Sequence, residues 1–74
     1  MLNEVRFGLR ISAEEYLRYY RGQARDALVT ATDGRKVRFP AAALRRHVTR
    51  EGISGFFVLR YDNRGKFHSL EREA

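Results

Sequence analysis

The chain of 74 residues contains no cysteine and no tryptophan, and it has a single proline, Pro40. Because cysteine is absent, disulfides, thiol nucleophiles and cysteine-ligated zinc or iron–sulfur sites are excluded. A chain without cysteine is compatible with a reducing compartment, and we expect a cytoplasmic protein. Lysine is scarce as well, since Lys36 and Lys66 are the only lysines among fifteen basic residues.

Long apolar runs are also lacking. The longest, Phe56–Leu59, is far shorter than the roughly 18 residues that a membrane-spanning helix requires. Charged residues interrupt the apolar ones throughout the first ten positions, so we predict no signal peptide. The length allows one domain over residues 1–74, with a small core, because a chain of this size buries only about 60% of its unfolded surface.

Positive charge dominates what is present. Fifteen Lys and Arg residues against nine Asp and Glu residues give a formal net charge of +6. A small basic domain attracts polyanions such as nucleic acid, anionic lipid or acidic protein surfaces. The alternative is that the charge serves solubility, with the arginines paired to Glu14, Glu15, Asp26 or Glu51.

The clearest structural pattern runs from Ala27 to Val48. Two strand-like segments, Arg25–Thr32 and Arg35–Phe39, flank Asp33-Gly34, a pair typical of a type I′ hairpin turn. Pro40 cannot donate to a strand ladder and suits a first helical turn, so we expect it to open a short helix over Ala41–Val48. Ala41, Leu44 and Val48 should face inward, and Ala42, Arg45 and Arg46 outward.

The N-terminal part alternates apolar and polar residues over Glu4–Ile11, which predicts a strand with one wet face. Ser12-Ala13-Glu14-Glu15 is a capping box that starts a helix, and Gly22 ends it. The helical spacing predicts a buried stripe of four residues: Ala13, Tyr16, Leu17 and Tyr20.

The C-terminal part contains a strand over Ser54–Asp62 with apolar residues on both faces, which favours a central strand covered on both sides. Asp62–Gly65 has turn chemistry, and Lys66–Glu71 returns as a short strand. The predicted order is therefore β-α-β-β-α-β-β, an α+β domain whose antiparallel sheet is strongly curved. Three glycines are candidate bend or bulge sites: Gly8, Gly52 and Gly55.

Three segments together resemble a known family: I-S-A-E-E-Y-L-R-Y-Y-R-G-Q-A-R over Ile11–Arg25, D-G-R-K-V-R-F-P-A-A-A-L-R over Asp33–Arg45, and G-I-S-G-F-F over Gly52–Phe57. They are similar to a family of short bacterial proteins classified only as a domain of unknown function. The likeness covers nearly the whole chain, and Y-Y-R-G and R-F-P-A are its most specific parts. It implies a compact bacterial protein and supplies no activity, cofactor or catalytic residue.

Our functional hypothesis is a non-catalytic protein that binds RNA through an arginine-rich surface. Guanidinium groups bind phosphates bidentately, and Tyr19 could stack on a base. Single strands are favoured over duplex DNA, since neither predicted helix looks long enough to read a groove. The candidate residues are Arg18, Tyr19, Arg21, Arg25, Arg35, Lys36, Arg38, Arg45 and Arg46. The rival hypothesis is a protein-interaction module whose partner is acidic.

Two further interpretations rest on partial patterns. The spacing Arg21-x-x-x-Arg25 resembles the arginine motif of PilZ-type cyclic-di-nucleotide binders, but their second motif does not align, because Gly52 stands at its acidic position and Phe57 at its final glycine. The helix and hairpin also resemble an Sm-like RNA-binding barrel, although here a strand precedes the helix.

No metal or catalytic motif is visible in the sequence. His47 and His68 are isolated histidines without a carboxylate-rich partner set, and the cap explains Ser12. We therefore expect no enzymatic activity, no metal and no cofactor.

Overall fold

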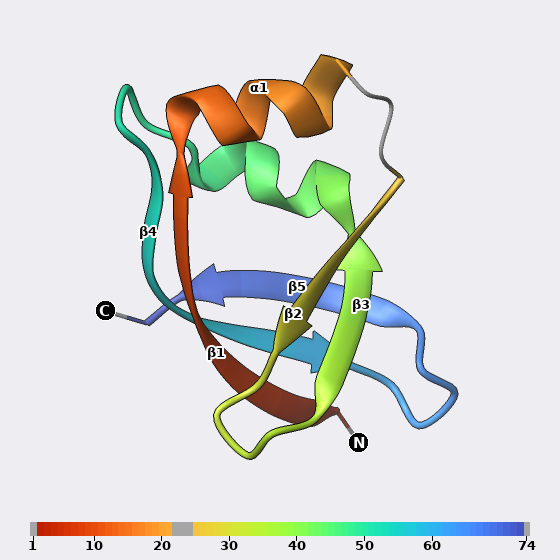
Figure 1. Ribbon diagram of the computed structural model, residues 1–74. Helices are drawn as coiled ribbons and strands as arrows, with labels where there is room; N and C mark the ends of the chain where they lie inside the picture. Colours follow the sequence, from red (N-terminus) through yellow and green to blue (C-terminus); the bar gives the residue numbers. More distant parts are fainter. Residues whose placement is uncertain (1, 22–24, 74) are drawn as a thin grey trace.

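The computed structural model describes residues 2–21 and 25–73, with residues 19–21 described by their backbone alone. Its elements are β1 (Asn3–Ser12), α1 (Ala13–Arg21), β2 (Asp26–Thr30), β3 (Lys36–Pro40), the 3₁₀ helix η1 (Ala41–His47), β4 (Gly52–Tyr61) and β5 (Phe67–Arg72). The predicted element order and the α+β class are confirmed. Both helices lie at one end of the molecule, opposite the turn between β2 and β3 (Figure 1).

The strands form two antiparallel sheets. One has the order β1-β4-β5, and the other is the β2–β3 hairpin. The antiparallel pairing is as predicted, but the strands form two sheets where one curved sheet was predicted; Figure 1 shows how strongly β1 and β4 bend. Among backbone bonds of the described residues, one joins the turn of the β2–β3 hairpin to the larger sheet: the Thr32 N–H donates to the Arg6 carbonyl at 2.8 Å.

The core lies between the two sheets, where the apolar faces of the alternating strands meet. The Phe7 ring stacks on Phe39 with centroids 5.6 Å apart and on Phe57 at 6.2 Å. These three rings come from β1, β3 and β4, and Phe7 and Phe57 are fully buried. Aromatic packing of this kind therefore connects the hairpin to the larger sheet.

Strand β4 is central, as predicted, but its outer face is covered in part only. Val58 is 2% exposed, whereas Phe56 is 56% exposed. In the register with β1, Val58 lies opposite Arg6, while Phe56 lies opposite Gly8. Glycine has no side chain to cover its neighbour, and the Phe56 ring lies directly over Gly8.

Helix α1 begins with the predicted capping box. The Glu15 N–H donates to Ser12 Oγ at 3.1 Å, and the Ser12 N–H donates to the Glu15 carboxylate at 3.4 Å. The predicted stripe is wrong at Leu17, which is 44% exposed, because α1 packs on β1 and β4 along a narrower face. The side chain of Tyr20 and the predicted helix end at Gly22 lie outside the described residues.

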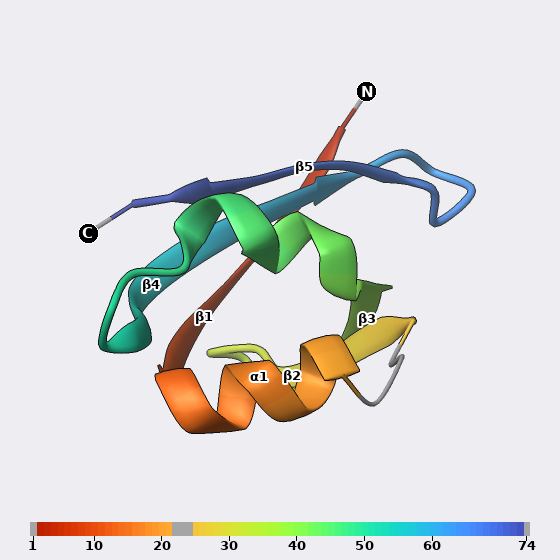
Figure 2. The same ribbon diagram turned by 90° about the horizontal axis from the view of Figure 1, so that it is seen from above.

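The second helix is a 3₁₀ helix, and Figure 2 shows it passing beside β4 and β5. With three residues per turn, positions 41, 44 and 47 fall on one face. Leu44 is fully buried there, and Arg45 and Arg46 are exposed as predicted. His47 does more than end the helix: its Nε2 lies 2.9 Å from the Leu70 carbonyl oxygen, and its ring packs edge-on against Phe57.

The first hairpin turn is a three-residue loop, so the predicted type I′ turn is wrong. The Ala31 N–H donates to the Arg35 carbonyl at 2.7 Å, and the Gly34 N–H donates to the Ala31 carbonyl at 2.9 Å. Gly34, the last residue of the loop, has a left-handed conformation with φ 92°. The Asp33 carboxylate accepts from the Arg35 N–H at 3.0 Å and thereby stabilises this longer loop.

The second hairpin repeats this construction around Asp62, Gly65 and Lys66. The Asp62 N–H donates to the Lys66 carbonyl at 3.0 Å, the Gly65 N–H donates to the Asp62 carbonyl at 2.9 Å, and Gly65 has φ 84°. The Asp62 carboxylate also accepts from the N–H groups of Arg64 and Lys66, each at 2.9 Å.

Of the three candidate bend glycines, Gly52 and Gly55 have positive φ, 108° and 142°. Gly8 instead makes room for the Phe56 ring. The register shift in the larger sheet lies elsewhere, between Arg60 and Tyr61.

Candidate nucleic-acid interface

The outer face of the β2–β3 hairpin carries two of the basic residues that the sequence singled out. Val37 and Phe39 point toward the core, so the alternation turns Lys36 and Arg38 to solvent, and both are exposed. Across the hairpin, Arg38 lies opposite Leu28, which is 55% exposed. The face therefore combines two cations with one exposed apolar side chain.

Acidic partners are concentrated on a different face of the molecule. On the outer side of β1 and β4, Arg60 pairs with Glu4 at 2.9 Å, and Arg6 pairs with Glu73 at 3.0 Å and with Glu4 at 3.5 Å. The hydrogen bond from Arg60 is the main cause that holds the pKa of Glu4 below its usual value. On this face the charges of Arg6 and Arg60 are compensated, whereas no ion pair is found for Arg10, further along β1, among the described residues.

At the hairpin turn, Arg35 pairs with Asp33 at 2.7 Å. The Arg35 backbone N–H, and then its guanidinium, lower the pKa of the Asp33 carboxyl. In return, the Asp33 carboxylate and then the Tyr61 hydroxyl raise the pKa of Arg35. Arg35 is thus held in place by groups from both hairpins.

Five other predicted residues are exposed, and no ion pair between them and a carboxylate is found within residues 2–18 and 25–73. We call these the hairpin-side cations: Arg18, Arg25, Lys36, Arg38 and Arg46. For these five residues, the alternative pairing with Glu14, Glu15, Asp26 or Glu51 is not found among the described side chains. Arg45 is exposed on η1 beside Arg46. The side chains of Tyr19 and Arg21 lie outside the described residues.

These residues are spread over α1, the β2–β3 hairpin and η1, and they do not form a single cluster. Arg25 precedes β2, and its carbonyl accepts from the Ala41 N–H at the start of η1. Arg35 lies at the opposite end of the hairpin, roughly 17 Å away for a five-residue strand. Of the two arginines in the motif Arg21-x-x-x-Arg25, only Arg25 has a described side chain. The proposed role of the motif in binding a cyclic dinucleotide therefore stays a prediction from the sequence.

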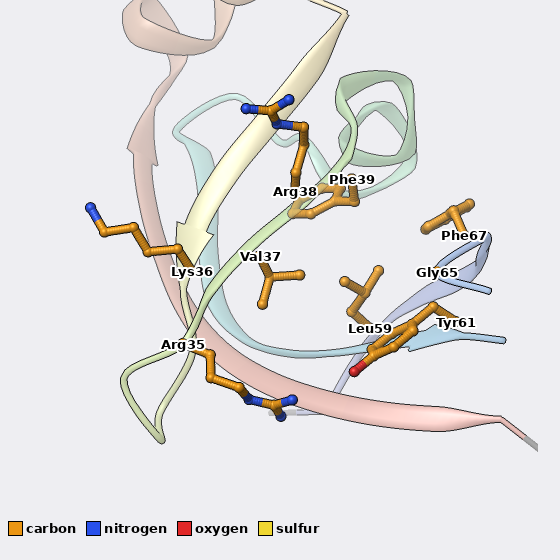
Figure 3. Close-up of a pocket in the computed structure, with 9 residues that line it drawn as sticks. All are labelled: Arg35, Lys36, Val37, Arg38, Phe39, Leu59, Tyr61, Gly65 and Phe67. Carbon is orange, nitrogen blue, oxygen red and sulfur yellow. The ribbon is translucent and has the colours of Figure 1, made fainter. Parts of the chain in front are cut away.

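A pocket of about 250 Å³ opens on the inner side of β3 (Figure 3). Its lining comes from β3 and its turn and from the β4–β5 hairpin: Arg35, Lys36, Val37, Arg38, Phe39, Leu59, Tyr61, Gly65 and Phe67. In Figure 3, the side chains of Tyr61 and Phe67 stand across the pocket from β3, and the Arg35 guanidinium lies near the Tyr61 hydroxyl.

No pattern in the sequence indicates this pocket directly. Tyr61 and Phe67 are paired across β4 and β5, yet they reach β3 only because the two sheets pack face to face. The one available signal was the alternation of β4, which puts Tyr61 on the same face as Phe57 and Leu59.

A second hollow, next to the start of α1, has mixed charge. Arg10, Glu15 and Glu51 line it, and Glu15 already serves the capping box. Within the described part of the chain, no group of three or more His, Asp or Glu side chains could hold a metal ion. None of the helices in that part is long and apolar enough to cross a membrane.

Comparison with known proteins gives one result. A family described as "Protein of unknown function (DUF2835)" matches residues 3–73, and the chain belongs to this family. No curated protein and no solved structure matches it.

Proposed function

We propose that this protein binds single-stranded RNA through the hairpin-side cations. The observation that supports the proposal is the uneven distribution of compensated charge. Arg6 and Arg60 have carboxylate partners, whereas Lys36 and Arg38 have none among the described residues. Uncompensated guanidinium and ammonium groups on one face of a hairpin attract a phosphate backbone.

A single strand fits the dimensions better than a duplex does. Helix α1 has nine residues and is about 14 Å long, and η1 is a seven-residue 3₁₀ helix that packs on the core through Leu44. Neither presents a free helix to a major groove, as duplex readers require. A flexible strand can follow the hairpin from Arg25 toward Arg35.

The second candidate function is binding of an acidic protein. Leu28 favours it, because an exposed leucine beside Arg38 is the kind of apolar contact that protein partners bury. RNA offers little to such a side chain, so the two candidates differ at this position.

The test compares two double variants that lose the same charge. Lys36→Gln with Arg38→Gln removes two hairpin-side cations, and Arg6→Gln with Arg60→Gln removes two paired arginines. Affinity for a fluorescein-labelled mixed-sequence RNA is measured by anisotropy at several salt concentrations. On single strands, the slope of log K against log salt changes by about 0.7 per phosphate contact.

If RNA contacts the hairpin, the first variant lowers the steepness of this slope by about 1.4 and the second leaves it nearly unchanged. Equal effects of both variants would mean that only net charge matters, and the proposal would be wrong. A Leu28→Ala variant serves as a further check, since it should leave RNA affinity unchanged.

A further inference from the structure

The outer edge of β3 carries backbone groups without a partner. In an antiparallel pair, residues that exchange hydrogen bonds alternate with residues that do not. Ala31–Arg35 and Arg25–Ala41 are bonded positions, with N–H···O distances of 2.7 and 2.8 Å. Counting inward along the register from either end, the bonded pairs are those of Val37 and Phe39.

Lys36 and Arg38 are therefore the alternate positions, and their N–H and C=O groups point away from β2. Among the described strands β3 pairs with β2 only, and no backbone bond from outside the ladders to these groups is found within residues 2–21 and 25–73. Pro40 occupies the third position of this kind, where its missing N–H costs no ladder bond. The free edge thus consists of two donor–acceptor pairs, one on Lys36 and one on Arg38.

This free edge forms one wall of the pocket. Five consecutive residues, 35 to 39, line it, although the alternation turns the side chains of Lys36 and Arg38 to the other side. Figure 3 shows both side chains directed away from the pocket, so their contribution to the wall is main chain. The opposite wall is aromatic, from Tyr61 and Phe67, and the floor is apolar, from Val37 and Leu59.

We propose that this pocket holds one nucleobase of the bound RNA; the inference rests on the proposed function and names its specificity site. The base would stack on the Tyr61 ring, and its hydrogen-bonding edge would meet a donor–acceptor pair of Lys36 or Arg38. The cationic side chains of these same residues stand at the rim and match the flanking phosphates in charge. Aromatic platforms beside a positive groove are the usual construction of single-strand sites.

The pocket fits a base better than it fits an extended peptide. A peptide that adds a strand to a sheet needs a long free edge, whereas this edge ends at Pro40 on one side and at the turn on the other. The volume of about 250 Å³ lies below the roughly 300–1,000 Å³ of sites for drug-sized ligands. A single nucleobase, with one flat ring system and one polar edge, fits both the short free edge and the small volume.

The first experiment uses the unmodified protein. Amide and aromatic NMR spectra of labelled protein are recorded with a six-nucleotide RNA and with an abasic sugar–phosphate strand of equal length. We expect both strands to shift surface signals near the hairpin-side cations. Only the base-bearing strand should shift the amides of Lys36 and Arg38 and the ring signals of Tyr61 and Phe67.

The second experiment separates the backbone donor from the charge. Arg38→Pro and Arg38→Ala lose the same guanidinium, but the proline variant also loses the free N–H without breaking a bond to β2. We expect Arg38→Pro to bind the RNA roughly 2- to 12-fold more weakly than Arg38→Ala, the range for one net hydrogen bond. Tyr61→Leu should weaken binding roughly 5- to 150-fold through lost stacking, while Tyr61→Phe should keep most of the affinity.

Three results would overturn the inference. If the abasic strand shifts the pocket signals as the RNA does, the pocket holds no base, although RNA binding would stand. If Arg38→Pro and Arg38→Ala bind equally well, the edge reads no base. If poly-glutamate shifts the edge amides while RNA shifts nothing, the proposed function fails together with the pocket. The abasic comparison needs no variant and remains decisive if Tyr61→Leu does not fold.

Discussion

Replacing Gly52 with alanine is expected to cost this protein a large part of its stability. Gly52 opens β4 opposite Ser12, where β1 passes into α1. A Cβ atom at Gly52 would overlap the Ile11 carbonyl oxygen and would lie 2.6 and 2.7 Å from backbone atoms of Ser12 and Ala13. These are backbone atoms of a paired strand and of the first helical residue, so they cannot rotate away as a side chain would.

Two terms contribute to the loss. Gly52 has φ 108°, a region where an L residue costs about 1–2 kcal/mol. The overlap adds more, because hydrogen bonds to Thr49 fix the Gly52 backbone at 2.7 and 3.0 Å. We expect a total of at least ~4 kcal/mol, the range reserved for severe steric change. A domain of 74 residues has roughly 4–11 kcal/mol in all.

Gly34→Ala is the matched control. Gly34 also has positive φ, 92°, but a Cβ there would meet nothing within 4 Å. It should lose only the backbone term, about 1–2 kcal/mol. The free energy of unfolding of both variants is measured by urea denaturation, followed by circular dichroism. Equal losses would show that the close approach at Gly52 is relieved by small shifts, and the steric argument would be refuted.

Two further changes test the local structure. Ser12→Ala removes the acceptor of the capping box and should lower the free energy of unfolding by about 1 kcal/mol. The control, Ser54→Ala on the exposed face of β4, should change the free energy of unfolding by less than about 0.5 kcal/mol. Similar values for both variants would argue against a stabilising cap. Asp62→Asn should reduce the loss of stability in acid. The backbone N–H groups of Lys66 and then Arg64 lower the pKa of the Asp62 carboxyl from its usual 3.8. The ionised carboxyl therefore stabilises the fold above pH 3.8, and this stabilisation is lost as the pH falls through the lower pKa of the folded state. Urea midpoints compared between pH 7 and about pH 2 check this, and an unchanged pH dependence in the variant would contradict it.

Local patterns predicted most of the fold, because the hydrogen bonds concerned are local. The capping box of Ser12 and Glu15 spans three residues, and both hairpins are marked by a glycine at the turn. The loop type at Asp33-Gly34 was wrong, since it depends on which residue takes the left-handed conformation. The Asp33 side chain favours the longer loop by accepting from the Arg35 N–H.

Predictions that depend on packing were less successful. Leu17 and Phe56 are exposed although their spacing predicted burial, because exposure depends on what lies across from each residue. Opposite Phe56 stands Gly8, which covers nothing. The division of the strands into two sheets likewise depends on long-range pairing that periodicity does not contain.

The candidate site likewise has some residues that the sequence predicted and others that depend on packing. Lys36 and Arg38 were found from the sequence, since charge and strand alternation are visible there. Tyr61 and Phe67 were missed, because their position opposite β3 arises only when the sheets pack together. The free donor–acceptor pairs of β3 follow from the register, which no composition or periodicity gives.

The pairing of β1 with β4 has a consequence for synthesis on the ribosome. Ser12 pairs with Gly52, so the strand that is made first waits for at least forty residues before its partner exists. At about 5–20 residues per second, this interval lasts roughly 2–8 s. During it, the apolar side of Val5 and Phe7 has no sheet to cover it, and such unpaired edges promote aggregation. The nascent chain therefore passes through a period in which a chaperone that shields short apolar strands would increase its yield.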